Sequence, residues 1–293
     1  MRNLIASCGR VASRSAFATI AAVLAVGVLA SAQTAQPAAP PKQAPAAPKP
    51  APPAPKPAPA ATQKTPQQGN LPSARSIIDR HIEAIGGRKA VLAHTSSHAS
   101  GTLSMPSSGI SGALDVYGAA PNKSLVKVNL GGIGDIVEGF DGTYGWALQP
   151  MTGPMLKQGK ELEEKKFDAD FYGDLHEPGR YVSMTTVEKT TFEGRPCYKV
   201  SLVRKEGGED IEYYDVETGL KAGAAGTRET PMGPVSATQI ISDYKKFGGM
   251  MLPTTMKQSA MGVEQIMKFT TVEWDNVPPS TFDPPPQIKA LIK

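Results

Sequence analysis

Two of the four histidines in this chain have a spacing that suits a metal ion. His94 and His98 are four residues apart, so a helix would place both imidazoles on one face, where they could share a zinc ion. However, they fall where the spacing of apolar residues changes from a helical period to that of a strand, and no third ligand follows at a suitable distance. The sequence therefore predicts no metal ion and no other cofactor.

The sequence also lacks the motifs of nucleophilic catalysis and phosphate binding. It has no Gly-x-Ser-x-Gly elbow, because residues 109–112 open a strand instead of forming a strand-to-helix turn. Residues 131–134 are rich in glycine but join two expected strands, so they lack the positive helix end that binds phosphate. Cys197 has no histidine near it in a known motif, and we interpret it as a structural thiol.

Acidic residues are concentrated in one stretch of the chain. Glu161, Glu163 and Glu164 crowd one expected helical turn, and Asp168 and Asp170 follow. A glycosidase needs two carboxylates that face each other across a sugar-sized cleft, and nothing in this run points to such a pair. A hydrolase that uses this acidic cluster stays as a further alternative. The cluster is typical of a solvated helix face, and we expect a protein that is not an enzyme.

Methionine is the residue type that points most directly to a ligand. Ten methionines follow Met1, and several lie in or beside expected strand ends and loops: Met151, Met155, Met232, Met250 and Met251. The flexible, polarisable thioether adapts to apolar ligands of varied shape. Two interpretations stay open at this stage: ordinary core residues, or the lining of a cavity that admits acyl chains.

Residues 1–32 have the features of a secretory signal peptide. Three arginines and no acid begin the chain, residues 16–29 are apolar, and Ala30-Ser31-Ala32 gives the small-x-small pattern that a signal peptidase cleaves. We therefore expect cleavage after Ala32 and export, with the periplasm as the destination. A retained membrane anchor is the alternative, although a full span needs about 20 apolar residues.

Residues 33–70 are predicted to be a disordered linker. They are almost entirely Pro, Ala, Lys and Gln, with almost no apolar side chain larger than Ala to bury. Such a composition favours an extended, semi-stiff polyproline II chain. The lysines either keep this linker solvated or contact an anionic surface such as lipid head groups, so transient contact with a membrane surface is one of the expected interactions.

The remaining part, residues 71–293, is acidic. It carries 24 basic and 27 acidic residues once three basic residues of the signal and four of the linker are set aside. A nucleic-acid-binding protein concentrates positive charge on its folded surface. We therefore expect no nucleic-acid partner.

Helices are expected at the start and in the middle of this folded part. Ser73 stands at an N-cap position ahead of four isoleucines at helical spacing, and Gly86-Gly87 ends that helix. A short helix is expected over residues 89–93, and an amphipathic helix over residues 159–174 is expected to cover the sheet.

Alternating apolar and polar residues predict about eleven or twelve strands over the rest of residues 71–293. Turn residues such as Asp141-Gly142 separate these strands, so consecutive strands should pair. A sheet of so many strands tends to curl. The predicted fold class is mainly β with a few helices (α+β): a curled antiparallel sheet that forms an incomplete β barrel, with the two longer helices as a lid. The proline-rich tail, residues 278–286, is expected to lie extended on the surface.

This order of elements resembles the lipoprotein carriers of the outer-membrane lipoprotein-sorting superfamily (LolA-like and LolB-like proteins). The resemblance rests on turn and packing motifs spread over residues 71–293: Ile85-Gly86-Gly87, Gly139-Phe140-Asp141-Gly142 with Trp146, residues 215–220, Asp243-Tyr244 with Gly248-Gly249, Leu252-Pro253, and Phe282.

The resemblance implies a non-catalytic envelope protein whose half-barrel encloses an apolar cavity for lipid or lipoprotein acyl chains. Its partners would then be a lipid or an acylated protein. A sensor or interaction module that docks another envelope protein on the same fold is the alternative. The residues expected to line the cavity are Leu103, Met105, Leu114, Val116, Val126, Val128, Ile136, Phe140, Trp146, Leu148, Phe167 and Phe171.

Overall fold

The computed structural model describes residues 71–230 and 233–293. The expected signal (1–32), the expected linker (33–70) and Met232 lie outside these described residues. Among the described residues, no helix has the length and the apolar character that crossing a membrane requires.

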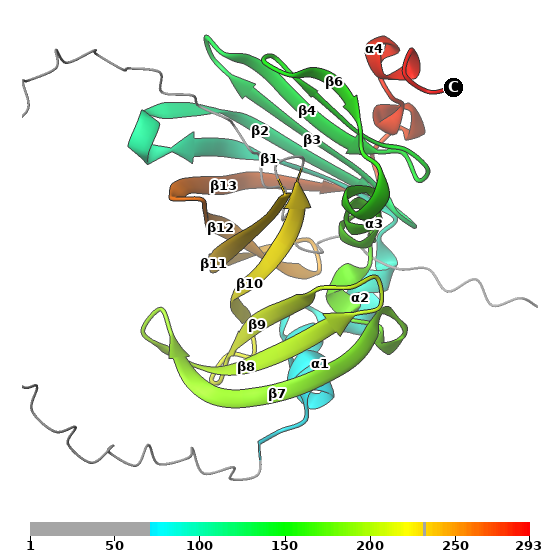
Figure 1. The fold of residues 1–293 in the computed structure, drawn as a ribbon. Coiled ribbons are helices and arrows are strands. Elements are labelled where there is room, and N and C mark those ends of the chain that lie inside the picture. The colour runs from blue at the N-terminus through cyan, green and yellow to red at the C-terminus, as the bar shows by residue number, and fades with distance from the viewer. Residues whose placement is uncertain (1–70, 231–232) are drawn as a thin grey trace, which may run out of the picture. The chain divides into compact units, whose positions relative to one another are not determined.

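The described residues form one antiparallel sheet of thirteen strands. Strands that follow each other in the chain pair with each other, except β6 and β7, and β1 also pairs with β13, so the order runs β6-β5-β4-β3-β2-β1-β13-β12-β11-β10-β9-β8-β7. The sheet curls, and its two edge strands, β6 and β7, do not pair with each other (Figure 1). The prediction of a mainly β fold built on one curled antiparallel sheet is confirmed.

The thirteen strands exceed the predicted eleven or twelve, and the unexpected strand is the short β6. The first six strands are β1 (Ser96–Met105), β2 (Ile110–Ala119), β3 (Lys123–Leu130), β4 (Gly134–Phe140), β5 (Gly145–Gln149) and β6 (Gly153–Leu156). The others are β7 (Tyr181–Phe192), β8 (Arg195–Arg204), β9 (Glu209–Asp215), β10 (Lys221–Thr230), β11 (Gly233–Phe247), β12 (Met250–Ala260) and β13 (Val263–Trp274).

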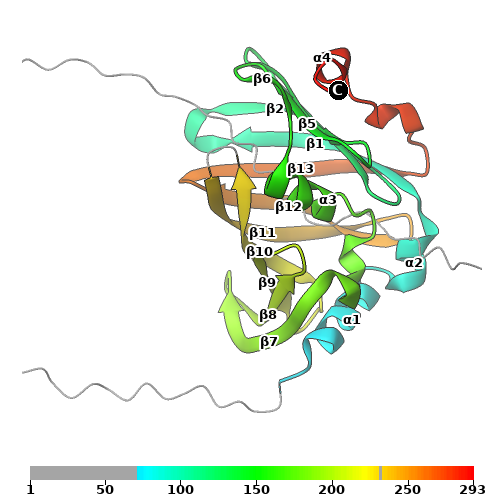
Figure 2. The same cartoon turned by 45° about the vertical axis from the view of Figure 1, so that its right-hand side comes forward.

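Four α-helices accompany the sheet within the described residues: α1 (Ala74–Ala84), α2 (Gly87–Ala93), α3 (Gly159–Asp168) and α4 (Pro286–Lys289). Ser73 caps α1 as expected, because its Oγ accepts the N–H of Ser76 at 3.1 Å. Gly86 joins α1 to α2 at φ 125°, where a Cβ would lie 2.5 Å from the carbonyl oxygen of Gly249. Only glycine fits both that dihedral angle and that close approach. Figures 1 and 2 show α1, α2 and α3 on the inner side of the curl.

The mid-chain helix is shorter than the predicted span of 159–174. Helix α3 ends at Asp168, and a 3₁₀ turn, η2 (Gly173–Leu175), follows. The chain turns there because the N–H of Phe171 donates to the carbonyl oxygen of Pro121 at 3.0 Å. This turn buries Phe171, Tyr172 and Leu175 completely or almost completely.

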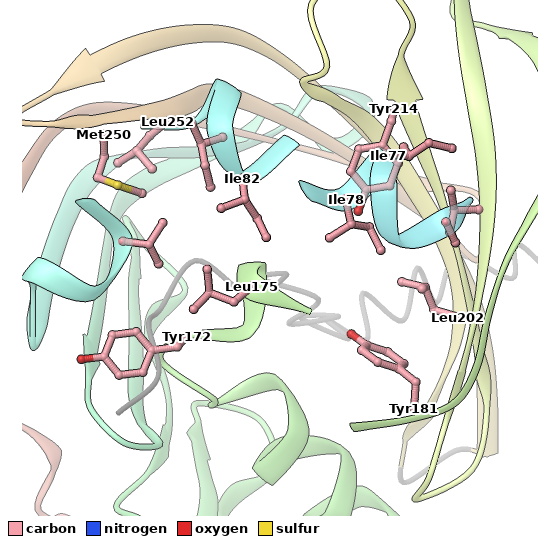
Figure 3. Packing of buried hydrophobic residues seen from close by; sticks show 14 of the residues in the cluster. Ile77, Ile78, Ile82, Tyr172, Leu175, Tyr181, Leu202, Tyr214, Met250 and Leu252 are labelled. Atoms are coloured by element: carbon pink, nitrogen blue, oxygen red, sulfur yellow. The ribbon is translucent and has the colours of Figure 1, made fainter. Parts of the chain in front are cut away.

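The largest described core lies between α1 and the sheet (Figure 3). Ile77, Ile78 and Ile82 of α1 face a group of apolar residues from the sheet and from the segment after α3: Tyr172, Leu175, Tyr181, Leu202, Tyr214, Met250 and Leu252. Burial of an isoleucine side chain contributes about 1.5–3 kcal/mol. The helix is therefore held to the sheet mainly by this apolar face.

A second core lies on the other face of the sheet and corrects the prediction for the C-terminal tail. Phe282 and Ile288 are buried against Leu125 and Trp146. Gly139 leaves room for the indole of Trp146, since a Cβ there would come within 2.4 Å of it. The tail is therefore packed by two apolar anchors and does not lie extended on the surface.

Candidate ligand-binding face

Most of the predicted cavity residues share one face of the sheet. In the antiparallel ladder, Leu114 lies opposite Val128, and Val128 lies opposite Ile136. Residues opposite each other or two apart point to the same side. The residues that this register places together are Leu103, Met105, Leu114, Val116, Val126, Val128, Ile136 and Phe140. We call this side the concave face, because α1 and α3 lie on the same side.

Trp146 and Leu148 do not belong to this face. Trp146 pairs with Gly139, and Leu148 pairs with Val137, both of which alternate with the concave-face residues of β4. Trp146 instead packs in the second core with Phe282. Strand β5 is correctly assigned from sequence, but the side to which Trp146 and Leu148 point was predicted wrongly.

Phe167 and Phe171 lie on the concave side, but they pack near α1 instead of on the strands that carry the other predicted residues. Phe171 belongs to the core beneath α1, and Phe167 packs against it. The guanidinium of Arg180 lies 3.9 Å from the centre of the Phe167 ring, within cation–π range. These two rings therefore join α3 and the segment after it to the core.

Strands β12 and β13 extend the apolar surface with methionines that the sequence left open between core and cavity. Met267 lies opposite both Leu103 and Met256 in the ladder, so all three share the concave face. Met151 and Met261, by contrast, lie at hairpin tips and are 68% and 66% exposed. The apolar half of the concave face, formed by β1–β4, β12 and β13, thus includes flexible side chains.

The helices make their most extensive sheet contacts elsewhere. Helix α1 contacts β7, and α3 contacts β10 and β5. The apolar half lies between these contact regions in the strand order. Its side chains are themselves buried, since Leu103, Leu114 and Met267 are 0%, 1% and 3% exposed.

The other half of the concave face, on β8–β11, carries an ion network. Its centre is Glu212, whose carboxylate lies 2.9 Å from Nε2 of His176 and 2.8 Å from Nζ of Lys221, and it also accepts the hydroxyl of Tyr214. Nδ1 of His176 faces the carbonyl oxygen of Asp174 at 2.9 Å. Both ring nitrogens of His176 therefore face acceptor oxygens.

Burial and charge shift the ionisation of these groups in different directions. Burial would raise the pKa of Glu212, but His176 and Lys221 hold that pKa well below its ordinary value. Burial raises the pKa of Asp174 to about 6 despite the nearby ammonium of Lys221. Burial, assisted by Lys221, lowers the pKa of His81 to about 3, so this imidazole is neutral.

A second group of charges joins α3 to β8–β10. Arg228 lies 2.7 Å from Asp210 and 3.8 Å from Asp168 of α3, and Arg204 lies 3.4 Å from Glu164 of the same helix. Glu164 also accepts the backbone N–H of Glu229 at 2.6 Å. The carboxylates of α3 therefore anchor the helix to the sheet.

The prediction of a solvated acidic face on α3 is wrong for Glu164 and Asp168, whose side chains are only 15% and 16% exposed. It holds for Glu163, which is 50% exposed. Because arginines of β8 and β10 face the helix from the sheet, no pattern within residues 159–174 could reveal this.

At its other side, α3 is held by Glu138 of β4. The carboxylate of Glu138 lies 2.8 Å from Nζ of Lys165 and 3.5 Å from Nζ of Lys157. Burial would raise the pKa of Glu138, but these two ammonium groups lower it to about 2. Lys157 is in turn bonded to Glu161 at 2.6 Å.

The other side chains that could bind a metal ion or act as a nucleophile, His94, His98 and Cys197, are in structural contacts or buried. His94 lies 2.7 Å from Asp275, and His98 lies 2.7 Å from Asp115, so the two histidines do not converge. Cys197 is buried, which raises the pKa of its thiol and keeps it poorly nucleophilic. Among the described residues, no cluster of histidine, cysteine or carboxylate side chains could hold a metal ion.

Two small, partly open cavities are lined by residues of the polar half together with residues of β12. One, of about 40 Å³, is lined by residues that include His81, Lys221 and Tyr244, and the other, of about 30 Å³, by residues that include Arg228 and Gln258. A volume of this size holds one or a few water-sized groups. Sequence reasoning missed this half, although alternating charges such as Asp210 and Glu212 in an otherwise strand-like segment were a visible signal.

Comparison with known proteins defines the fold. No protein-family model and no curated protein match the chain. A crystal structure of a DUF1329 family protein from Desulfovibrio piger is similar with a TM-score of 0.51 and 12% identity, over 72% of this chain and 97% of that one. A LolA superfamily protein from Nitrosomonas europaea is similar with a TM-score of 0.50 and 13% identity, over 73% of this chain and 99% of that one. The chain therefore has a LolA-like fold, as the sequence resemblance predicted.

Proposed function

We propose that this protein is a non-catalytic binding protein of the cell envelope that holds a hydrocarbon chain, from a lipid or a lipid-modified protein, on the apolar half of its concave face. The observation that carries the proposal is the cross-strand continuity of apolar side chains from Met256 and Met267 through Leu103 and Leu114 to Ile136. A curved apolar face has to be filled by side chains, a helix or a ligand.

Two further features support the proposal. The LolA-like fold is shared with a protein of the LolA superfamily. Export, expected from residues 1–32, would bring the domain to lipid surfaces, and the linker at 33–70 would give it reach.

The test is direct binding by the full chain. Protein purified from a bacterial host should yield lipid on solvent extraction, identified by mass spectrometry. After delipidation it should bind a fluorescent fatty-acid probe. Val116→Trp, which enlarges a concave-face side chain, should weaken probe binding at least about ten-fold, equivalent to ~1.4 kcal/mol.

The matched control is Val187→Trp on β7, a position that is 45% exposed. This variant should bind the probe like the parent chain, and thermal unfolding of both variants should show that they are folded. Failure to retain lipid or bind the probe, together with capture of one stoichiometric envelope protein, would overturn the proposal in favour of an interaction module.

A further inference from the structure

Three glutamines form a row across the concave face where its apolar and charged halves meet. Gln239 of β11 lies opposite Gln258 of β12, which lies opposite Gln265 of β13. All three are buried, with 6%, 3% and 7% of their surfaces exposed. Buried side-chain amides need hydrogen-bond partners, so a row of them on a ligand-binding face is a marked departure from an apolar lining.

Gln258 supplies an unused acceptor in this row. Its side-chain oxygen is buried and has no hydrogen-bond partner among the described residues. The neighbouring amide nitrogen of Gln239 lies 3.9 Å from the sulfur of Met256, which is a weak acceptor. A buried acceptor left in this state costs free energy that a donor on a bound molecule would recover.

A cavity of about 30 Å³ lies beside this amide. Its wall includes Gln258, Gln239 and small residues of β10 and β11 such as Ala224, Gly226 and Ala237. Gly226 lies opposite Ala237 and Ala224 lies opposite Gln239, so these small residues leave space between the charged side chains and the glutamines. The volume suits a single hydroxyl or ammonium group and is too small for a hydrocarbon chain.

The charges around the cavity disfavour an anionic group. Asp210 and Glu212 both line it. The one guanidinium in its wall, that of Arg228, is held by Asp210 at 2.7 Å and by Asp168 at 3.8 Å. A carboxylate or phosphate entering here would meet two carboxylates and a cation that is already paired.

We propose that the glutamine row and this cavity bind the head group of the ligand, and that this head group donates a hydrogen bond and carries no negative charge. The inference rests on the proposed function, since the attached chain would lie on the apolar half. The head-group site adjoins the apolar half on the concave face. Met256 lies two residues from Gln258 on β12, and Met267 lies two residues from Gln265 on β13. Two residues along a strand span about 7 Å, a short step from head group to chain.

The experiment compares four molecules that share one oleyl chain: oleyl alcohol, oleylamine, oleic acid and methyl oleate. The delipidated full chain is incubated with an equimolar mixture and separated from free lipid by gel filtration, and the bound lipids are extracted and quantified by mass spectrometry. We expect the alcohol or the amine to be enriched about five-fold over methyl oleate, as one hydrogen bond provides. The alcohol and amine arms separate a neutral from a cationic head group.

Gln258→Leu should abolish this enrichment without reducing the retention of methyl oleate, and Gln287→Leu, at an exposed position of α4, should preserve it. Equal retention of all four molecules, or preference for oleic acid, overturns the head-group inference and leaves the proposed function standing. Retention of none of them overturns the proposed function, and the head-group inference with it. The preference of the parent chain decides the question even if Gln258→Leu does not fold.

Discussion

His176 and Glu212 lie 2.9 Å apart, Nε2 to Oε2, with side chains that are only 4% and 5% exposed. One comes from the segment after α3 and the other from β9 of the sheet. Their contact therefore holds the segment after α3 against the polar half of the concave face. Because the pair is buried, removal of one partner leaves the other uncompensated away from water, which costs more than breaking a surface pair.

Glu212→Gln should destabilise the domain strongly. The substitution leaves the buried ammonium of Lys221 without the carboxylate that lies 2.8 Å from it, and it removes the charge that faces His176. Loss of one partner from a buried ion pair costs about 3–5 kcal/mol. Urea unfolding at neutral pH measures this loss as a lower midpoint.

The control for this measurement is Glu264→Gln, which breaks the exposed pair with Lys257 on β12. An exposed pair contributes about 0–1 kcal/mol, so the midpoint should hardly move. Equal effects of the two substitutions would show that the network around Glu212 contributes no more than a surface ion pair.

Glu138→Gln should loosen α3 while the sheet stays folded. Glu138 is the group on β4 that holds Lys165 of α3 and the preceding Lys157. Amide hydrogen exchange within residues 159–168 should accelerate about ten-fold, equivalent to ~1.4 kcal/mol of opening free energy. Glu188→Gln, which breaks a more exposed pair with Lys199 on β7 and β8, should leave exchange in α3 unchanged. Unchanged exchange in both variants would mean that α3 is held by other contacts.

The sheet could be predicted from the sequence because the residue pattern within each strand shows that one face is buried and the other is not. Alternation of apolar and polar residues defines a strand whose two faces differ, and turns such as Asp141-Gly142 separate neighbours. Asp141 does cap its turn, accepting the N–H groups of Thr143 and Tyr144 at 2.8 and 2.7 Å. Strand β6 escaped prediction because four residues, among them Gly153 and Pro154, are too few to show a period.

Contacts between side chains that are distant in the sequence could not be predicted. Trp146 alternates correctly within its strand, but which side of β5 is concave depends on pairing with Gly139. Glu164 and Asp168 look like surface acids until arginines from β8 and β10 are placed against them. A single chain shows local periodicity, whereas burial of a charge depends on residues distant in sequence.

Phe282→Ala should show that the C-terminal tail is part of the fold. Phe282 is 1% exposed and packs with Leu125 and Trp146 on the outer face. Truncation of a buried phenylalanine costs about 3–5 kcal/mol. The thermal midpoint should fall accordingly, whereas Leu291→Ala, at a position that is 42% exposed, should leave it nearly unchanged. A tail that merely lies along the surface would give two equally small effects.

Asp168→Asn should stabilise the domain, relative to the parent chain, more at neutral pH than at acidic pH. Burial raises the pKa of Asp168 to about 6, although Arg228 opposes the shift. The folded state thus binds this proton more tightly than the unfolded chain does, so the contribution of Asp168 to stability falls as pH rises from about 4 to about 6. Two units of pKa correspond to an upper limit of about 3 kcal/mol, a penalty that asparagine does not carry.

His81 changes stability in the opposite sense over an overlapping pH range, because burial lowers its pKa to about 3. The quantity to compare is therefore the unfolding free energy of the variant minus that of the parent at each pH. Urea unfolding at pH 4.5 and 7.5 should give a difference that increases with pH, whereas Asp283→Asn at an exposed position should give none. A constant difference would mean that Asp168 ionises as freely in the folded state as in the unfolded chain, and a difference that decreases with pH would mean that it ionises more readily when folded.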